Sequence, residues 1–300
     1  MKYTYTQFKA QYADDDACLD AILQRQLERD PSCHGCGVTP AKFHRITGRR
    51  GYACQDCGHH IYPCAGTIFE HSPTPLTLWF HAVYLLTATR NGVSAKELER
   101  QLGVTYKCAW RIGHQLRDLM AARDKANTPP QLSGHVEIDE TYVGGRKKTG
   151  PRRRGMQIAG RFDNKTCVMG MVERGAAFKG QVVPNAKKTS LLPIVLKNIA
   201  HGTLVNTDEL ATYKNLPKLG YQHVALNHAQ HEYVRGIHHT NRIEGFWSHL
   251  KRGIVSTHVS VSRKHLQRYV DEFAFRYNNR HEPADMFRRL IAQVSKPTSF

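Results

Sequence analysis

The 300-residue sequence predicts a multi-domain protein, in which a small metal-binding module and a helical region precede a larger α/β domain. Two Cys-x-x-Cys pairs lie near the amino terminus, and helical patterns follow them. Beyond residue 130, short strand-like runs alternate with helical patterns. We therefore expect a helical segment at 1–30, the metal module at 31–71, the helical region at 72–126, the α/β domain at 133–282, and a C-terminal helix and tail at 283–300.

The charge of the chain points to a polyanionic partner. The 43 Lys and Arg residues against 25 Asp and Glu residues give a formal net charge of +18, and binding to phosphates releases condensed counterions. A basic surface without such a partner is the alternative. The first ten residues lack the apolar core of a secretory signal, and the run Leu76 to Leu86 is too short to span a bilayer. We expect a cytoplasmic protein, associated with the nucleoid if the polyanion is DNA, and no membrane partner.

The cysteine pairs predict one structural Zn²⁺ site of the zinc-ribbon type. Seventeen residues separate Cys33-His-Gly-Cys36 from Cys54-Gln-Asp-Cys57, a spacing typical of zinc sites. Two thiolates from each tight turn complete a tetrahedral shell, and a closed shell of four thiolates leaves no position for a substrate. The alternative is four unrelated free cysteines. The predicted ligands are Cys33, Cys36, Cys54 and Cys57.

The helical region predicts a helix-turn-helix. A helix from Ser94 ends at Gly103, and a second helix begins at Thr105 and continues through Leu119. In a helix-turn-helix the second helix enters the major groove of DNA. An ordinary helical hairpin with solvated basic residues is the alternative. The second helix is expected to expose Tyr106, Lys107, Arg111, His114 and Arg117.

Two strand-like runs in the α/β domain end near aspartates. The run Val136 to Val143 places Glu137 and Asp139 on one face and apolar residues on the other. The run Leu204 to Thr207 is followed directly by Asp208. Strand ends commonly carry metal ligands, although a turn alone also favours aspartate there.

A predicted helix at Arg242 to Lys251 carries Glu244, seven residues before Lys251 on the same face. One side chain of that face can hold a metal ion while the other holds DNA; electrostatics at the helix start is the alternative role for Glu244. Between the strand of Asp139 and the next strand lies a run of cations that we expect to clamp DNA phosphates, although such runs are often solvated loops. The cations are Arg146, Lys147, Lys148, Arg152, Arg153 and Arg154.

These motifs resemble the zinc-ribbon insertion-sequence transposases of the DDE superfamily. The segments that carry the resemblance are residues 136–145, residues 206–209 and residues 239–252. The resemblance implies a ribonuclease-H-like catalytic domain with a mixed sheet flanked by helices. It further implies that Asp139, Asp208 and Glu244 form the catalytic triad, with Asn241 as an alternative third position. Lys251, with Arg252 beside it, would contact DNA.

The chemistry that the resemblance implies is cleavage and transfer of DNA strands. Two Mg²⁺ ions, for which Mn²⁺ can substitute, would be held by the three carboxylates. The partners would be the terminal inverted repeats of a bacterial insertion sequence and a target DNA, bound by at least a dimer. Two alternatives remain open: a zinc-ribbon transcriptional regulator, and a metal-dependent nuclease without strand transfer.

Overall fold

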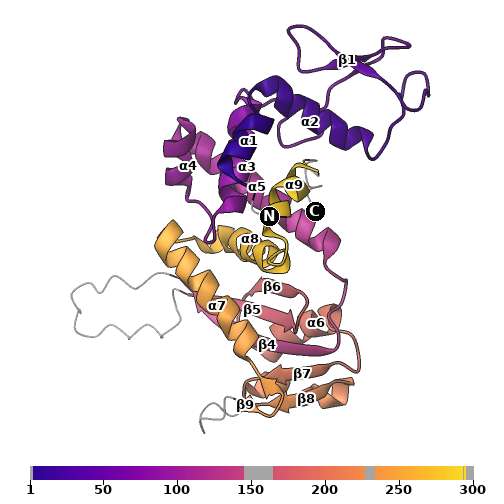
Figure 1. Ribbon diagram of the computed structural model, residues 1–300. Helices are drawn as coiled ribbons and strands as arrows, with labels where there is room; N and C mark the ends of the chain where they lie inside the picture. The colour runs from indigo at the N-terminus through magenta and orange to yellow at the C-terminus, as the bar shows by residue number, and fades with distance from the viewer. Residues whose placement is uncertain (1–2, 145–164, 227–233, 293, 295–300) are drawn as a thin grey trace, which may run out of the picture. The chain divides into compact units, whose positions relative to one another are not determined.

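The computed structural model describes residues 3–144, 165–226, 234–292 and 294, which form two compact units. The first unit comprises residues 1–123 together with 281–300, and the second comprises residues 124–280 (Figure 1). The finer division into five parts stays a prediction. No helix among the described residues is long and apolar enough to cross a membrane.

The first unit combines helices with a small antiparallel sheet of three strands in the order β1-β2-β3. Polar residues begin several of its helices: the Thr4 hydroxyl, the Asp14 carboxylate and the Ser94 hydroxyl each accept a hydrogen bond from a backbone N–H of the first turn. The elements are α1 (Tyr5–Gln11), α2 (Asp15–Leu27), β1 (Phe43–Arg45), β2 (Tyr52–Cys54), β3 (His60–Ile61), α3 (Leu76–Ala88), α4 (Ala95–Leu102), the first part of α5 (Tyr106–Asn127) and α9 (Met286–Ile291).

Both ends of the chain contribute to the core of the first unit. Phe287 of α9 is 2% exposed, and its ring contacts those of Phe8, Tyr12 and Phe80 at centroid distances of 5.7, 5.5 and 6.2 Å. Ile68 N–H also donates a hydrogen bond to the carbonyl of Val294 (3.0 Å). The predicted C-terminal helix is therefore part of the amino-terminal unit.

Helices α4 and α5 are joined by a tight turn, as the sequence predicts. Gly103 ends α4 in the left-handed conformation (φ 63°), which glycine adopts without strain. The prediction that His114 and Arg117 are exposed is wrong, because both are buried (6% and 2%). The Arg117 guanidinium instead donates a hydrogen bond to the carbonyl of Val93 (3.2 Å), just before α4.

The second unit is built on a five-stranded mixed sheet in the order β6-β5-β4-β7-β8. Strand β4 pairs antiparallel with β5 and parallel with β7; β5 pairs antiparallel with β6, and β7 parallel with β8. Strands β4 and β7 lie where the sequence predicts strands, at 136–143 and 204–207. The elements are β4 (His135–Val143), β5 (Thr166–Glu173), β6 (Phe178–Val183), α6 (Lys188–Asn198), β7 (Leu204–Thr207), β8 (Gln222–Ala225), β9 (Val234–Arg235), β10 (His238–His239), α7 (Asn241–Gly253) and α8 (Leu266–Asn278).

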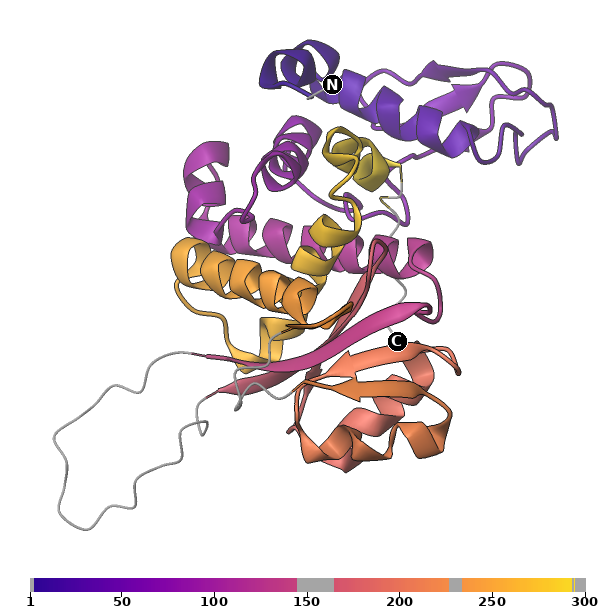
Figure 2. The same ribbon diagram turned by 60° about the horizontal axis from the view of Figure 1, so that its bottom comes forward.

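Two apolar cores lie on the two faces of the sheet, and Figure 2 shows helices α7 and α8 on one side of it and α6 on the other. On one face, Val136 and Ile138 of β4 pack with Leu191 and Val195 of α6. On the other face, β5 and β6 are covered by apolar side chains of α7 and α8, including Phe246, Trp247, Leu250, Val270 and Phe273. The alternation of side chains along β4 thus sends Val136 and Ile138 to the α6 face, and Glu137 and Asp139 to the α7 face.

Candidate functional site

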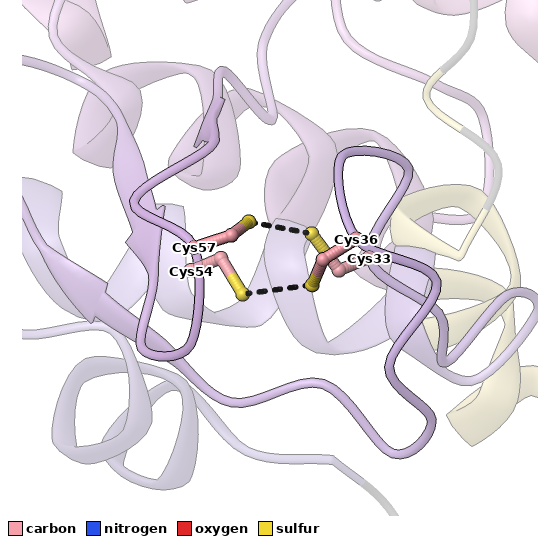
Figure 3. Close-up of side chains that lie close together, drawn as sticks. All are labelled: Cys33, Cys36, Cys54 and Cys57. Carbon is pink, nitrogen blue, oxygen red and sulfur yellow. Dashed lines mark hydrogen bonds between the residues drawn. The ribbon is translucent and has the colours of Figure 1, made fainter.

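The four predicted zinc ligands form a compact cluster in the first unit (Figure 3). The Sγ atoms of Cys33 and Cys57 are 3.7 Å apart, and those of Cys36 and Cys54 are 4.0 Å apart. All four sulfur atoms lie within 4.8 Å of one another. In a tetrahedron with Zn–S bonds of 2.3 Å the sulfur atoms are about 3.8 Å apart, so the cluster fits one Zn²⁺ ion.

The two cysteine turns have the same backbone construction. The N–H of Gly37 donates to the carbonyl of Cys33 (2.7 Å), and the N–H of Gly58 donates to the carbonyl of Cys54 (2.9 Å). Both glycines have φ near 70° (74° and 72°), a conformation that favours glycine. Burial raises the pKa of Cys33, but the backbone N–H groups of Cys36 and Gly35 outweigh that effect and bring its pKa down to about 7. Thiolate is the form that binds metal.

In the second unit, the two predicted catalytic aspartates extend from neighbouring parallel strands. Glu137 of β4 lies opposite Asn206 of β7 in the ladder, and each aspartate follows two residues later, at 139 and 208. Side chains two residues apart in a strand share a face. Asp139 therefore lies on the face that α7 covers, and Asp208, directly after the last residue of β7, is near enough for its charge to act on Asp139.

The surroundings of Asp139 favour its neutral form in the absence of a cation. Burial, then the negative charge of Asp208, raises its pKa to about 7, and the charge of Glu244 adds to this effect. Two donors oppose the shift: the backbone N–H of Glu140 to Oδ1 (2.8 Å) and the indole Nε1–H of Trp247 to Oδ2 (3.1 Å). Crowded carboxylates raise one another's pKa in this way, and a bound cation would relieve the repulsion.

Glu244 lies in the first turn of α7, and its side chain is exposed. Its Oε1 accepts a hydrogen bond from the Thr240 hydroxyl (2.8 Å). Asn241, the alternative third position, is exposed at the first residue of the same helix. Asp139, Asp208 and Glu244 are near enough to interact electrostatically, but among the described residues only the cysteines form a group of three or more potential ligands with donor atoms within 4.8 Å.

Glu140 points away from this face of the sheet. Its carboxylate accepts a hydrogen bond from the hydroxyl of the buried Tyr213. Burial, followed by the charges of Asp139 and Asp208, raises the pKa of Glu140 to about 9. The neutral form of Glu140 is therefore favoured at pH 7, and a protonated carboxyl is a poor ligand for Mg²⁺.

The predicted DNA-contacting residues occupy separate regions. Lys251 and Arg252 are exposed near the end of α7. Tyr106 (50% exposed) and Lys107 are exposed at the start of α5, whereas Arg111 is half-buried with its guanidinium 5.7 Å from the ring centroid of Trp79. The basic run from Arg146 to Arg154 lies outside the described residues.

The sequence-based interpretation missed the roles of two side chains beside the aspartates. The helical spacing of Trp247 predicts only packing on the sheet, but its indole N–H also contacts Asp139. Glu137 was placed on the face of Asp139 without a function, but its carboxylate contacts the start of α7. The sequence shows only that Trp247 lies one helical turn after Glu244 and that Glu137 shares the face of Asp139, and neither spacing indicates which atoms the two side chains contact.

Comparison with known proteins places this α/β unit in the class of transposase domains. The family model described as the ISXO2-like transposase domain matches residues 131–278. An uncharacterised protein of the transposable element ISH50 from Halobacterium salinarum is 33% identical over 276 residues, covering 88% of this chain and 90% of the relative. An uncharacterised transposase-like protein of Haemophilus influenzae is 31% identical over 98 residues, or 33% of this chain and 78% of the relative.

The chain belongs to the insertion-sequence DDE transposase family that this model describes. Among solved structures, the Mos1 transposase paired-end complex with the left transposon end is similar at 11% identity and a TM-score of 0.30, over 73% of this chain and 80% of that one. A similarity that low supports no conclusion about this protein.

Proposed function

We propose that this transposase cleaves DNA at the terminal inverted repeats of its insertion sequence and joins the freed strand to target DNA. Asp139, Asp208 and Glu244 act as the catalytic carboxylates and together hold two Mg²⁺ ions, which Mn²⁺ can replace. Asn241 is the alternative third ligand. The observation that carries the proposal is that Asp139 of β4 lies near enough to Asp208, directly after the neighbouring strand β7, and to Glu244 of α7 for both charges to raise its pKa.

The sheet supports assignment of a ribonuclease-H-like catalytic domain. Its order β6-β5-β4-β7-β8 combines an antiparallel half with a parallel half. The aspartates follow the carboxyl ends of the ladder shared by the two central parallel strands, where an α/β sheet commonly carries its active site.

Three oxygen donors suit hard divalent cations, which prefer carboxylates and keep several waters. When bound, such cations activate the attacking water or 3′-hydroxyl and neutralise charge on the phosphate during an in-line displacement. The residues of this chain contribute orientation. The indole of Trp247 holds one oxygen of Asp139, and Lys251 and Arg252, exposed farther along α7, bind phosphates of the DNA backbone.

Recognition of the repeats is assigned to the first unit. Tyr106 and Lys107 at the start of α5 are exposed and follow the tight turn after α4, as at the reading end of a recognition helix. The cysteine cluster holds one structural Zn²⁺ ion. Because two element ends must meet for transposition, the active assembly is at least a dimer on DNA.

The test is a joining assay with purified protein, Mg²⁺ or Mn²⁺, and DNA that carries candidate terminal repeats. We expect joined products with the native protein and at least a 100-fold loss with Asp208→Asn, because removing one carboxylate weakens the transition-state metal site. Glu209→Gln is the matched control, since Glu209 is the exposed acid next to Asp208. Nicking without joining would favour a nuclease. Tight binding without cleavage would favour a transcriptional regulator.

A further inference from the structure

The start of α7, which carries Glu244, is capped from the sheet rather than by its own N-cap residue. The Thr240 side chain accepts no hydrogen bond from a backbone N–H of the first turn. Instead, Oε2 of Glu137 in β4 accepts hydrogen bonds from the backbone N–H groups of Arg242 (2.9 Å) and Ile243 (3.2 Å). The first N–H groups of a helix have no partner within it, and a carboxylate is favoured at this positive end of the helix dipole.

The other oxygen of Glu137 is held by Arg174, which also contacts the short hairpin β9–β10. Oε1 accepts a hydrogen bond from Nε of Arg174 (2.8 Å), and Nδ1 of His239 lies 3.2 Å away. The same guanidinium donates to the carbonyls of Ile237 and His239. Since an arginine fork is rigid, this arrangement fixes the hairpin and Glu137 to each other. The carboxylate of Glu137 is fully buried (0% exposed).

Asn206, the neighbour of Glu137 on β7, holds the same hairpin from the other side. Its Nδ2 contacts the carbonyl of His239 (3.2 Å) and Nε2 of His135 (2.7 Å), while its Oδ1 contacts Nδ1 of His238 (3.1 Å). One polar row, Glu137 and Asn206, therefore crosses β4 and β7 and anchors the hairpin and α7. Each of the two aspartates lies two residues farther along the chain, Asp139 within β4 and Asp208 directly after β7.

We propose that Glu137 is a positioning residue: by capping α7 from β4, it sets where Glu244 stands relative to Asp139 and Asp208. This inference rests on the proposed function. Glu244 follows the capped residues Arg242 and Ile243 directly, so a displaced first turn carries Glu244 with it. Glu137 and Asp139 share one strand, so the cap fixes the helix to the element that supplies the first aspartate.

The experiment compares Glu137→Gln with Glu173→Gln, whose half-buried carboxylate accepts hydrogen bonds from Ser133 rather than from α7. We expect Glu137→Gln to speed amide hydrogen exchange in the first turn of α7 and to weaken Mn²⁺ binding, followed by calorimetry, by about 10- to 100-fold, as for other residues that orient metal ligands. Glu173→Gln should change neither. If Glu137→Gln does not fold, Glu137→Asp serves instead, because it keeps the charge but is one methylene short of the α7 amides.

A double variant separates positioning from general stabilisation. If Glu137 acts through Glu244, adding Glu137→Gln to Glu244→Gln should weaken Mn²⁺ binding no further than Glu244→Gln alone. If the losses of Mn²⁺ affinity from the two substitutions instead multiply in the double variant, the inference is overturned. Unchanged hydrogen exchange in Glu137→Gln would overturn it as well. The exchange measurement needs neither metal nor DNA. Unchanged hydrogen exchange in the first turn of α7 would therefore refute the capping role of Glu137 even if the protein is an active transposase. Full joining activity of Asp208→Asn would refute the proposed function without bearing on the capping role of Glu137.

Discussion

Replacing Gly170 with alanine should dislodge Trp247 from Asp139. Gly170 of β5 lies opposite Asp139 of β4 in the antiparallel ladder, and the Trp247 ring packs against it. A Cβ at Gly170 would lie 2.6 and 2.7 Å from two indole carbons of Trp247, and 2.9 Å from Phe178. Normal contacts between carbon atoms begin at about 3.5 Å. The indole would have to move by about 1 Å, which breaks its 3.1 Å hydrogen bond to Asp139.

The loss of stability expected for Gly170→Ala follows from these contacts. Trp247 is 4% exposed and is surrounded by the apolar core under α7, so the ring has little room to adjust. Overpacking of this kind costs about 1–3 kcal/mol. Loss of the hydrogen bond adds about 1 kcal/mol, because the half-buried Asp139 can recover only part of it from water. We expect the free energy of unfolding of the second unit to fall by about 2–4 kcal/mol.

Urea unfolding of Gly170→Ala and Gly245→Ala tests this reasoning. Gly245 lies within α7, and a Cβ there would meet no atom within 4 Å, so alanine should stabilise the helix by about 0.5–1 kcal/mol. The two identical substitutions should therefore shift the unfolding midpoint in opposite directions, and only Gly170→Ala should weaken Mn²⁺ binding. A midpoint for Gly170→Ala at or above that of the native protein would refute the packing account.

Four further outcomes are expected. The pKa of Asp139 is about 7 in the folded, metal-free protein, above its ordinary value of 3.8, so between these two pH values the folded protein keeps a proton that the unfolded chain loses. The unfolding free energy should therefore fall as pH rises from about 4 to 7, and Asp139→Asn should flatten that slope. Trp247→Phe keeps the ring but removes the N–H donor to Asp139, so Mn²⁺ affinity measured by calorimetry should fall about tenfold while the secondary structure seen by circular dichroism is unchanged. Cys57→Ser should lower the zinc content measured by atomic absorption and destabilise the first unit, whereas Cys108→Ser, outside the cluster, should bind the one zinc per chain that we expect of the native protein. Lys107→Ala should weaken DNA binding and lower the magnitude of its salt slope by about 1, and an unchanged slope would remove Lys107 from the DNA interface.

The periodicity of the sequence predicted the strands and helices of the second unit well, because each pattern depends on residues close together in the chain. The four-cysteine cluster was predictable for the same reason, since its geometry follows from two local turns. The contacts of Glu137 were not predictable, because its partners Arg174 and Arg242 are 37 and 105 residues away.

The burial of side chains on α5 was predicted wrongly for a different reason. The helical pattern of α5 indicates which residues share a face, but not which face meets the neighbouring helices. His114 and Arg117 were expected in solvent and are buried. A basic side chain can be accommodated there when a backbone carbonyl accepts its hydrogen bond, as Val93 does for Arg117.

The two-ended construction of the first unit has a consequence for biosynthesis. Phe8, Tyr12 and Phe80 are translated early, but the ring of Phe287 that completes their core follows about 200 residues after Phe80, on the order of 10–40 s later at common rates of elongation. Part of the apolar surface of the nascent amino-terminal helices therefore stays uncovered while the α/β unit is synthesised. Synthesis of the unit that carries the cysteine cluster therefore begins before that of the α/β unit and ends after it.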